Sequence, residues 1–467
     1  MSADGTGGPR VVIAGAGFAG LTALDDLARH ARGGRAGAAG SRAPVTLVDR
    51  NSYSTFQPLL YQVATAGLTS ADVAYPAWSA VRKAGAHFRK GEITGLDADA
   101  RDVLLADGSV LGYDYLILAT GVSAAFFGVA GAAEHSFSLY TRRDAIILRD
   151  RVIGELERRS VTGDDGELTI TVAGGGATGV ELAGTLAELR NIALPAAFPM
   201  IDRERIHVRL IELGPALLAP FRESQREYAR RELVDRGVEV LLRTEIKQVA
   251  AGHVLISRDG AADPADSAGR GRGPSDGRGP GDGRGPGDGA GESTLPSDIT
   301  VWAAGVAAPE WIGKLGLPTG RGGRVLTGAD LRVLGQDRIF AAGDIALIDG
   351  YPLPQLAQPA IQQGRHAAAQ VRRLAAGQPT RPFSYKDKGV MATIGHRSAV
   401  VELPSRIRAR GTLAWLAWLA LHLVTLLGGR NRISALVNLS WRYLTWSRGG
   451  GVIIGDDQPG PAGDPGR

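Results

Sequence analysis

The sequence contains no cysteine among its 467 residues. This absence excludes disulfide bonds, a thiolate nucleophile and metal sites with cysteine ligands, and we expect no metal site of another kind. The chain also has no acidic residue from Leu403 to Gly455. The same stretch contains Arg406, Arg408, Arg410, Arg430, Arg432, Arg442 and Arg448. A local basic block of this kind indicates contact with an anionic surface.

Long apolar segments are scarce as well. The N-terminal MSADGTGGPR has no apolar core of a secretory signal, so we expect a cytoplasmic location. The apolar run at 413–427 has 15 residues, fewer than the roughly 20 that span a bilayer. The remaining composition, 44% hydrophobic and 22% charged, is typical of a globular protein, and the length predicts two or three domains.

The last 65 residues differ in character from the rest of the chain. Four of the seven tryptophans lie there: Trp415, Trp418, Trp441 and Trp446. The run 413–427 is followed by ISALVNLSWRYLTW, in which apolar residues recur every three or four positions. Such helices, with flanking arginines and interfacial tryptophans, are typical of segments that lie in a membrane surface. A buried helix pair or a dimer interface is the alternative, and dimerisation is compatible with membrane contact.

Two segments of the chain share one pattern. Residues 11–29 and 168–189 each contain a short β-branched strand, a glycine-rich turn and a helix with apolar periodicity. A second strand follows in each case and ends in an acid, Asp49 or Glu212. This repeat, about 160 residues apart, predicts two nucleotide-binding βαβ units.

Both glycine-rich turns match the motif G-x-G-x-x-G. Its first glycine permits a tight turn, its second lets the backbone approach a pyrophosphate, and its third allows close packing of strand and helix. The N-terminus of the following helix faces the anion. The motif residues are Gly15, Gly17 and Gly20 in the first turn, and Gly174, Gly176 and Gly179 in the second. One match alone is weak evidence, but two in one chain predict two dinucleotides.

The acids that end the second strands are expected to accept hydrogen bonds from ribose hydroxyls. Asp49 follows Gly20 by more than the usual ~20 residues, which we attribute to a loop at 30–44. No arginine immediately follows Glu212, and its carboxylate would repel a 2′-phosphate. We therefore expect the second unit to bind NADH rather than NADPH.

Further strands end in small residues or in an acid. Those at 114–121 and 298–305 end in Gly121 and Gly305, and such ends suit a backbone lying close to a ligand. A third, at 338–344, ends in Asp344.

Glu181 is expected in the first turn of its helix, two residues after Gly179. There it either complements the helix dipole or lies near the nicotinamide, where it could orient the carboxamide or relay a proton.

Four stretches resemble the type II, non-proton-pumping NADH:quinone oxidoreductases. They are FQPLLYQVAT at 56–65, AQPAIQ at 357–362, YKDKGVMATIGHRSAV at 385–400 and the C-terminal LAWLAWLALHLVTLLGGRNR. The second of these fits the family's A-Q-x-A-x-Q motif. The resemblance covers essentially the whole chain apart from residues 260–293 and the ends.

This resemblance implies non-covalent FAD as the cofactor, NADH as the substrate and a membrane quinone as the acceptor. It implies that Gln358 and Gln362, which share one helix face, lie against the isoalloxazine ring and help form the quinone tunnel. Asp344 resembles the acid that binds the ribityl and phosphate region of FAD.

The resemblance also implies a lysine near the quinone pocket. Lys388 resembles it, Lys386 is the rival, and either could be a solvated surface lysine. Met391 would line the same pocket.

We therefore expect an α/β fold with two Rossmann-like dinucleotide-binding domains and an α-rich C-terminal membrane-association segment. The FAD domain comprises residues 1–125 and 306–380, the NADH domain residues 126–305, and the C-terminal segment residues 381–467. The low-complexity residues 260–293 are expected to form a disordered loop. The expected partners are a membrane quinone, the cytoplasmic face of the membrane and a second copy in a homodimer, with no nucleic acid.

Related functions can be compared with this interpretation. Disulfide reductases of this fold and sulfide:quinone oxidoreductases need cysteines, which the chain lacks. An NADH-sensing flavoprotein with slow turnover and an NADH-dependent reductase of another acceptor, such as a protein, both stay open. The absence of an evident spanning helix predicts no proton pumping.

Overall fold

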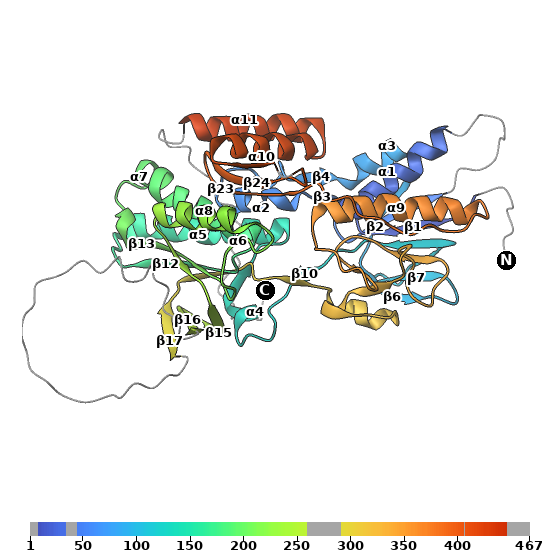
Figure 1. Ribbon diagram of the computed structural model, residues 1–467, viewed down its shortest axis with the longest axis horizontal. Helices are drawn as coiled ribbons and strands as arrows, with labels where there is room; N and C mark the ends of the chain where they lie inside the picture. The colour runs from blue at the N-terminus through green and yellow to red at the C-terminus, as the bar shows by residue number, and fades with distance from the viewer. Residues whose placement is uncertain (1–7, 34–43, 259–290, 406, 446–467) are drawn as a thin grey trace, which may run out of the picture.

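The computed structural model describes residues 8–33, 44–258, 291–405 and 407–445. Two α/β lobes lie side by side, and the C-terminal helices α10 (Thr412–Thr425) and α11 (Gly429–Thr445) lie on top (Figure 1). Among the described helices, none is both long enough and apolar enough to cross a membrane. The fold is mixed α/β with two parallel, Rossmann-like sheets.

The first lobe is built on a five-stranded parallel sheet in the order β21-β9-β1-β2-β5. Its strands are β1 (Val11–Ala14), β2 (Val45–Asp49), β5 (His87–Lys90), β9 (Tyr115–Leu118) and β21 (Ile339–Ala341). All residues of β1 and β9 are buried, because helices and loops cover both faces of a parallel sheet. Since β21 pairs with β9, the chain returns to the N-terminal sheet after leaving it for the second lobe.

The second lobe repeats this arrangement in the order β11-β18-β12-β13-β14, again all parallel. Its strands are β11 (Ser136–Ser138), β12 (Leu168–Ala173), β13 (Ile206–Ile211), β14 (Val238–Leu241) and β18 (Ile299–Trp302). An antiparallel sheet of β15 (Thr244–Ala250), β16 (His253–Arg258) and β17 (Gly291–Pro296) lies beside it. Residues 291–293 of the expected disordered loop are therefore in a strand, and residues 260–290 lie outside the described residues.

Helices cover the sheets and connect their strands. In the first lobe α1 (Phe18–Gly33) packs against α9 (Ala357–Ala375), and their small buried residues allow the close approach. The other helices are α2 (Leu60–Ala64), α3 (Ala77–Ala84), α4 (Ala132–His135), α5 (Arg142–Thr162), α6 (Ala177–Glu188), α7 (Leu194–Ala197) and α8 (Glu223–Asp235). The remaining strands are β3 (Tyr53–Thr55), β4 (Ala74–Pro76), β6 (Ile93–Asp97), β7 (Asp102–Leu105), β8 (Val110–Gly112), β10 (Ser123–Ala124), β19 (Val306–Ala307), β20 (Val325–Thr327) and β22 (Ala346–Ile348).

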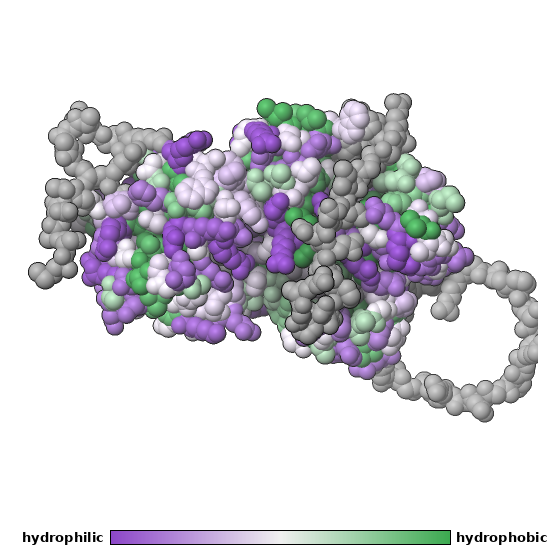
Figure 2. All heavy atoms as spheres, turned by 180° about the vertical axis from the view of Figure 1, so that it is seen from behind, coloured by the Kyte–Doolittle hydropathy of each residue, from purple (hydrophilic) through white to green (hydrophobic). Residues whose placement is uncertain are grey.

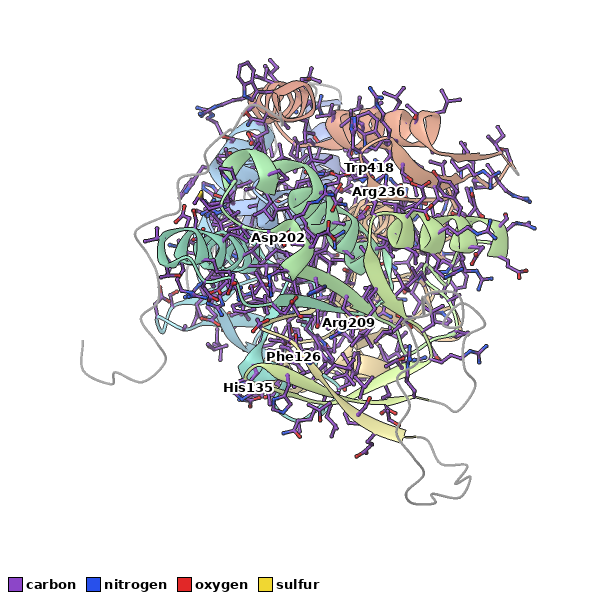
Figure 3. The ribbon with its side chains drawn as sticks, turned by 90° about the vertical axis from the view of Figure 1, so that its left-hand side faces the viewer. Phe126, His135, Asp202, Arg209, Arg236 and Trp418 are labelled. Atoms are coloured by element: carbon purple, nitrogen blue, oxygen red, sulfur yellow. The ribbon has the colours of Figure 1, made fainter. Side chains whose placement is uncertain are left out.

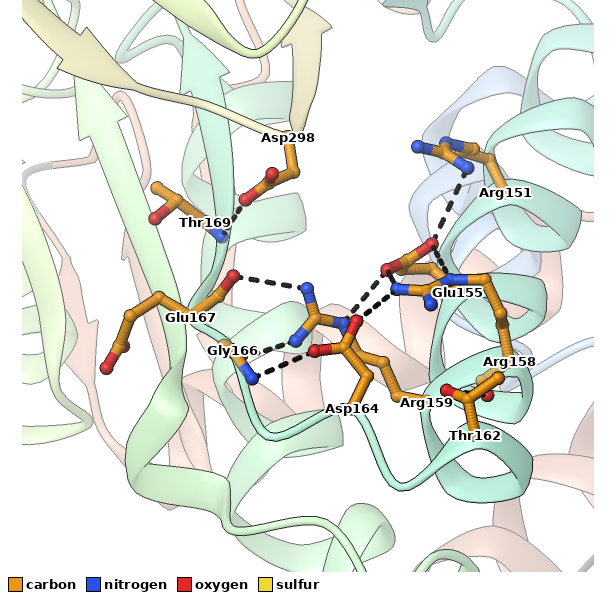
Figure 4. Close-up of polar contacts among 10 residues, drawn as sticks. All are labelled: Arg151, Glu155, Arg158, Arg159, Thr162, Asp164, Gly166, Glu167, Thr169 and Asp298. Carbon is orange, nitrogen blue, oxygen red and sulfur yellow. Dashed lines mark hydrogen bonds and ion pairs between the residues drawn. The ribbon is translucent and has the colours of Figure 1, made fainter.

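A buried ion-pair network fastens the end of α5 to the start of β12 (Figure 4). Arg159 donates to Glu155 and to the carbonyl oxygens of Gly166 and Glu167. Burial opposes ionisation of Glu155, but hydrogen bonds from Arg158 and Arg159 outweigh it and lower its pKa. The network holds the turn that leads from α5 into the central strand of the second sheet.

The C-terminal segment was expected to be α-rich, but it also contains a sheet. β23 (Val390–Gly395), β24 (Ser398–Glu402) and β25 (Arg408–Arg410) pair antiparallel before α10 begins. Helix α11 then docks on the first lobe through three polar side chains. Asn431 donates to the Ala74 carbonyl oxygen, while Ser434 and Asn438 donate to the buried carboxylate of Asp72.

Candidate active site

The two glycine-rich turns have the same geometry. Gly15 and Gly174 both have φ near +107°, a conformation that favours glycine (φ 106 and 107). A Cβ at either position would collide with the backbone at the end of the neighbouring strand, at Ala119 or Ala303. A Cβ at Gly20 or Gly179 would collide with the carbonyl oxygen of the first glycine of its own turn.

The middle glycine of each turn differs from its neighbours. A Cβ at Gly17 or Gly176 would meet no protein atom within 4 Å. The protein's own packing thus explains the first and third glycines but not the second. Open space at that position is what a pyrophosphate lying against the backbone needs.

An acid from the adjacent strand holds each turn. Asp49 accepts hydrogen bonds from the backbone N–H groups of Ala16 and Asn51, both at 2.7 Å. Glu212 accepts from Gly175 and Gly214 at 2.5 and 2.6 Å. Burial raises the pKa of Asp49, and its two backbone hydrogen bonds lower it in part. A carboxylate accepts about four hydrogen bonds, so each acid keeps lone pairs for ribose hydroxyls.

The ends of the neighbouring strands contain further candidates. Gly121 and Gly305 have φ of 68° and 152°, and a Cβ at Gly305 would press on the Phe127 ring. Burial raises the pKa of Asp344 to about 6, while Arg324 and a hydrogen bond from Tyr140 lower it in part. Asp344 is therefore a half-buried carboxyl group with one tyrosine partner, three residues after the end of β21.

The three glutamines near the start of α9 have different environments. The Oε1 atom of Gln358 is buried without a hydrogen-bond partner among the described residues. Gln362 is engaged at both ends: its Nε2 donates to the Lys386 carbonyl oxygen and its Oε1 accepts from the Lys386 N–H. Gln363, which the sequence analysis did not single out, accepts from the Gly343 N–H at 2.6 Å and so supports the turn before Asp344.

Glu181 lies deeper in its helix than the sequence analysis expected. Helix α6 begins at Ala177, so Glu181 is beyond the first turn and the helix-dipole alternative loses its basis. Its Oε1 accepts from the Thr393 N–H of β23 at 3.3 Å. Glu188, two turns further, accepts from the His396 N–H, and a Cβ at Gly184 between them would collide with the Ile394 carbonyl oxygen. The backbone of β23 thus docks directly on α6.

Burial raises the pKa of Glu181 to about 8. The Thr393 N–H and the Trp418 indole lower it only in part. The Trp418 N–H has no well-aligned acceptor among the described residues, so this second interaction is weak. Glu181 therefore carries a proton at neutral pH in a site closed to solvent.

An aromatic cluster joins the C-terminal helix α10 to the first lobe. The His422 ring stacks on the Trp418 ring with 4.1 Å between the ring centroids, and the centroid of the Tyr61 ring lies 6.2 Å from that of Trp418. Phe56 lies edge-on to His422 at 6.2 Å and to Phe18 at 5.8 Å. Trp418 lies on the inner side of the C-terminal helices (Figure 3). The cluster thus extends from Phe18, next to Gly17, to the neighbourhood of Glu181.

The lysine candidates lie away from this interior. Lys386 and Lys388 are both exposed, and Met391 is half-buried against the large apolar core. Since Gln362 binds the backbone of Lys386, α9 holds the chain segment that bears both lysines.

Comparison with known proteins agrees with this geometry. Residues 9–364 match the family of pyridine nucleotide-disulphide oxidoreductases. The chain is 34% identical to the type II NADH:quinone oxidoreductase NdhA of Mycobacterium tuberculosis, over 94% of this chain and 88% of that protein. It is 32% identical to Ndh of the same organism, over 96% and 91%. The chain belongs to the type II NADH:quinone oxidoreductases.

A solved structure has the same fold. The structure of NDH2 from Plasmodium falciparum in complex with NADH superposes with a TM-score of 0.79, covering 93% of this chain and 98% of that one at 18% identity. At this identity the likeness concerns the fold.

Within this type II NADH:quinone oxidoreductase, α10 and α11 present an apolar face. It comprises Leu413, Leu416, Leu421, Val424, Ile433, Leu436, Val437 and Trp441, all exposed. Hydrophobic residues gather at the top edge of the molecule (Figure 2). The four tryptophans expected at the membrane surface have different environments. Trp415 and Trp418 are buried, Trp441 is exposed, and Trp446 lies outside the described residues.

Three side chains of this oxidoreductase were missed by sequence reasoning. Gln363, Tyr140 and His422 each contact a candidate site residue or its support. The only signal for His422 was its position four residues after Trp418, which puts both on one helix face. The other two have no local signal, because their partners are distant in the sequence.

Proposed function

We propose that the protein transfers a hydride from NADH to a non-covalently bound FAD and passes two electrons to a membrane quinone without pumping protons. The observation that carries this proposal is the repeated glycine turn. Each of the two turns leaves open space at its middle glycine beside a carboxylate with spare lone pairs. When bound, FAD supplies the ability to accept a hydride from one substrate and release electrons to another.

The first lobe fits FAD. Gly15, Gly17 and Gly20 would hold its pyrophosphate, Asp49 its ribose, and Gly121 and Asp344 the adjoining backbone and ribityl region. Three buried oxygens support a polar ligand here, since they have no hydrogen-bond partner among the described residues. They are Oε1 of Gln57, Oγ1 of Thr120 and Oε1 of Gln358.

The second lobe fits NADH. Gly174, Gly176 and Gly179 would hold the pyrophosphate, Glu212 the ribose, and Gly305 the nearby backbone. Hydride transfer to a flavin needs no acid or base, so these residues act by orienting the substrate. This assignment keeps the domain boundaries proposed from the sequence: 1–125 and 306–380 for FAD, 126–305 for NADH, and 381–467 for the C-terminal segment.

Quinone reduction requires protons as well as electrons. We assign Gln358 and Gln362 to the quinone and flavin side of the site, with Lys388 near its entrance. The unpaired Oε1 of Gln358 supports a direct contact, whereas the paired amide of Gln362 supports a positioning role. Glu181 is the buried group that holds a proton at neutral pH.

The C-terminal helices are proposed to bind the membrane surface from the cytoplasmic side. Their apolar face is exposed, and Arg430 and Arg432 are exposed beside it. The sequence from Leu403 to Gly455 contains no acidic residue, so no carboxylate there would repel anionic lipid. A homodimer through this region is compatible with the same surface.

The test is steady-state NADH oxidation by the purified full chain, with and without a short-chain benzoquinone, while flavin absorbance is followed. We expect bound FAD, and oxidation at several turnovers per second or faster that depends on the quinone. Flavin that NADH reduces but quinone reoxidises only slowly would favour a sensor or another acceptor. Absence of bound flavin would refute the proposal.

A further inference from the structure

His422 lies between the exposed apolar side of α10 and the interior of the site. Its neighbours Leu421 and Val424 are exposed on the apolar face. Its ring is half-buried, stacked on Trp418 and edge-on to Phe56. A molecule that passes from the apolar face toward the first glycine turn would therefore pass close to this imidazole.

The hydrogen bonding of His422 determines which nitrogen carries the proton. Its Nδ1 lies 2.7 Å from the Trp418 carbonyl oxygen. A carbonyl oxygen can only accept, so Nδ1 must donate and carry the hydrogen. Burial lowers the pKa of His422 to about 4, which keeps the ring neutral at physiological pH. Nε2 is therefore a bare lone pair, and no described residue is hydrogen-bonded to it.

We propose that His422 is a binding residue of the quinone pocket that recognises the reduced head group, because its Nε2 accepts a hydrogen bond from a quinol hydroxyl. This inference rests on the proposed function and adds a determinant of which redox form is bound. An oxidised quinone has only acceptor oxygens, so its carbonyl faces the Nε2 lone pair without a shared proton. The quinol hydroxyl supplies that proton.

The structure fixes both the tautomer and the orientation of the His422 ring, so Nε2 can only accept a hydrogen bond. Nδ1 is already committed to the Trp418 carbonyl oxygen, so the ring cannot exchange tautomers without losing that bond. The stacking on Trp418 holds the ring plane in place. A single neutral hydrogen bond of ordinary strength favours the quinol about fivefold over an otherwise equal ligand.

The experiment compares inhibition by the product with use of the substrate. The ratio of the quinol Ki to the quinone KM is measured anaerobically with a short-chain benzoquinone and its quinol, for the parent and for His422→Phe and His422→Gln. The phenylalanine keeps a ring for stacking and removes both nitrogens, so we expect the ratio to rise about fivefold. The glutamine carries an acceptor oxygen for the quinol and a donor amide for the quinone, so we expect a ratio between those of the parent and His422→Phe.

A control and a second measurement complete the test. His366→Phe alters a histidine in the middle of α9 whose Nε2 bonds the Arg381 carbonyl oxygen, and should leave the ratio unaltered. In the unaltered protein, the dimethyl ether of the quinol, which cannot donate, should inhibit several-fold more weakly than the quinol. Equal inhibition by the quinol and its ether would refute the inference even if His422→Phe does not fold.

Two results would overturn the inference. One is an unchanged ratio in His422→Phe, and the other is equal inhibition by the quinol and its ether. If the parent oxidises NADH rapidly with quinone and either result is found, only the role of His422 is refuted. If the parent does not reduce the quinone at all, the proposed function fails and the inference falls with it.

Discussion

Asp49 and Glu212 make the same pair of hydrogen bonds in the two lobes. Each accepts from the N–H group that follows the first glycine of its turn and from the N–H group two residues after itself. The two acids are thus equivalent supports of two equivalent turns, although their sequence contexts differ. Because each carboxyl group occupies the ribose position of its turn, each disfavours a 2′-phosphate there.

Glu212→Gln should reduce the preference for NADH over NADPH. Removing the charge removes repulsion of the 2′-phosphate, and we expect the ratio of the two kcat/KM values to fall roughly tenfold, the equivalent of ~1.4 kcal/mol. The matched variant Asp49→Asn should instead weaken FAD retention and leave that ratio alone. A parent enzyme that prefers NADPH would contradict the assignment.

Gln358→Ala should lower kcat/KM for quinone by about tenfold, because the variant loses an amide whose oxygen is free to bind a ligand. Flavin reduction by NADH alone, followed by stopped flow, should persist. Gln363→Ala is the contrasting variant, since its amide supports the Gly343 N–H. Gln363→Ala should lower the midpoint of thermal unfolding and the FAD content. If both variants change quinone kinetics, thermal midpoint and FAD content in the same way, Gln358 has no distinct role in the site.

Glu181 should make stability depend on pH. Its pKa in the folded state is about 8 against an ordinary value of 4.5, so the folded protein binds its proton more tightly than the unfolded chain. The contribution of Glu181 to the free energy of unfolding is therefore fully present below about pH 4.5. It is lost as the pH rises from about 4.5 to about 8, by up to ~1.4 kcal/mol per pH unit.

The measurement is the difference in free energy of unfolding between the parent and Glu181→Gln across that range of pH. The neutral amide cannot ionise, so the variant should lack this part of the pH dependence. Parallel curves for the two proteins would show that Glu181 is not buried and neutral.

The double variant with Ile433→Glu and Val437→Glu should release the protein from anionic vesicles. Both side chains are exposed, by 67% and 57%, on the outer side of α11, whereas Asn431, Ser434 and Asn438 face inward. Two charges on this face should weaken partitioning at least roughly tenfold. Val161→Glu, at a site that is 87% exposed on α5, is the control and should bind like the parent.

Substitution tests the membrane face more sharply than truncation. Deleting residues 403–467 would also remove Trp415, Trp418 and Leu439 from the core. Loss of binding after such a deletion could therefore reflect misfolding. Retained vesicle binding by the double glutamate variant would exclude α11 as the contact.

Arg159→Met should destabilise the second lobe. The change leaves Glu155 buried and strips partners from the Gly166 and Glu167 carbonyl oxygens, so we expect a loss of about 3 kcal/mol in urea unfolding. Arg151→Met, which removes a half-exposed partner 3.7 Å from Glu155, should cost less than about 1 kcal/mol. Equal effects would mean that the network is not buried in solution.

The sequence by itself determined the repeated cofactor units. The two glycine motifs, the acids after them and the apolar strands are local patterns, because a turn with φ near +107° and a buried parallel strand each restrict residue type at short range (φ 106 and 107 for Gly15 and Gly174). The A-Q-x-A-x-Q motif likewise indicated a helix that bears Gln358, and α9 begins at Ala357.

Only the tertiary structure decided what each side chain meets. Gln358 and Gln362 share a motif and a helix face, yet one oxygen is unpaired while the other amide is bound to Lys386, a partner 24 residues away. Glu181 is buried where α6 packs against β23, about 210 residues further along the chain, and this burial raises its pKa although the Thr393 N–H lowers it in part. Burial and charge state depend on the sum of distant contacts and desolvation, and no spacing rule in a linear sequence contains that sum.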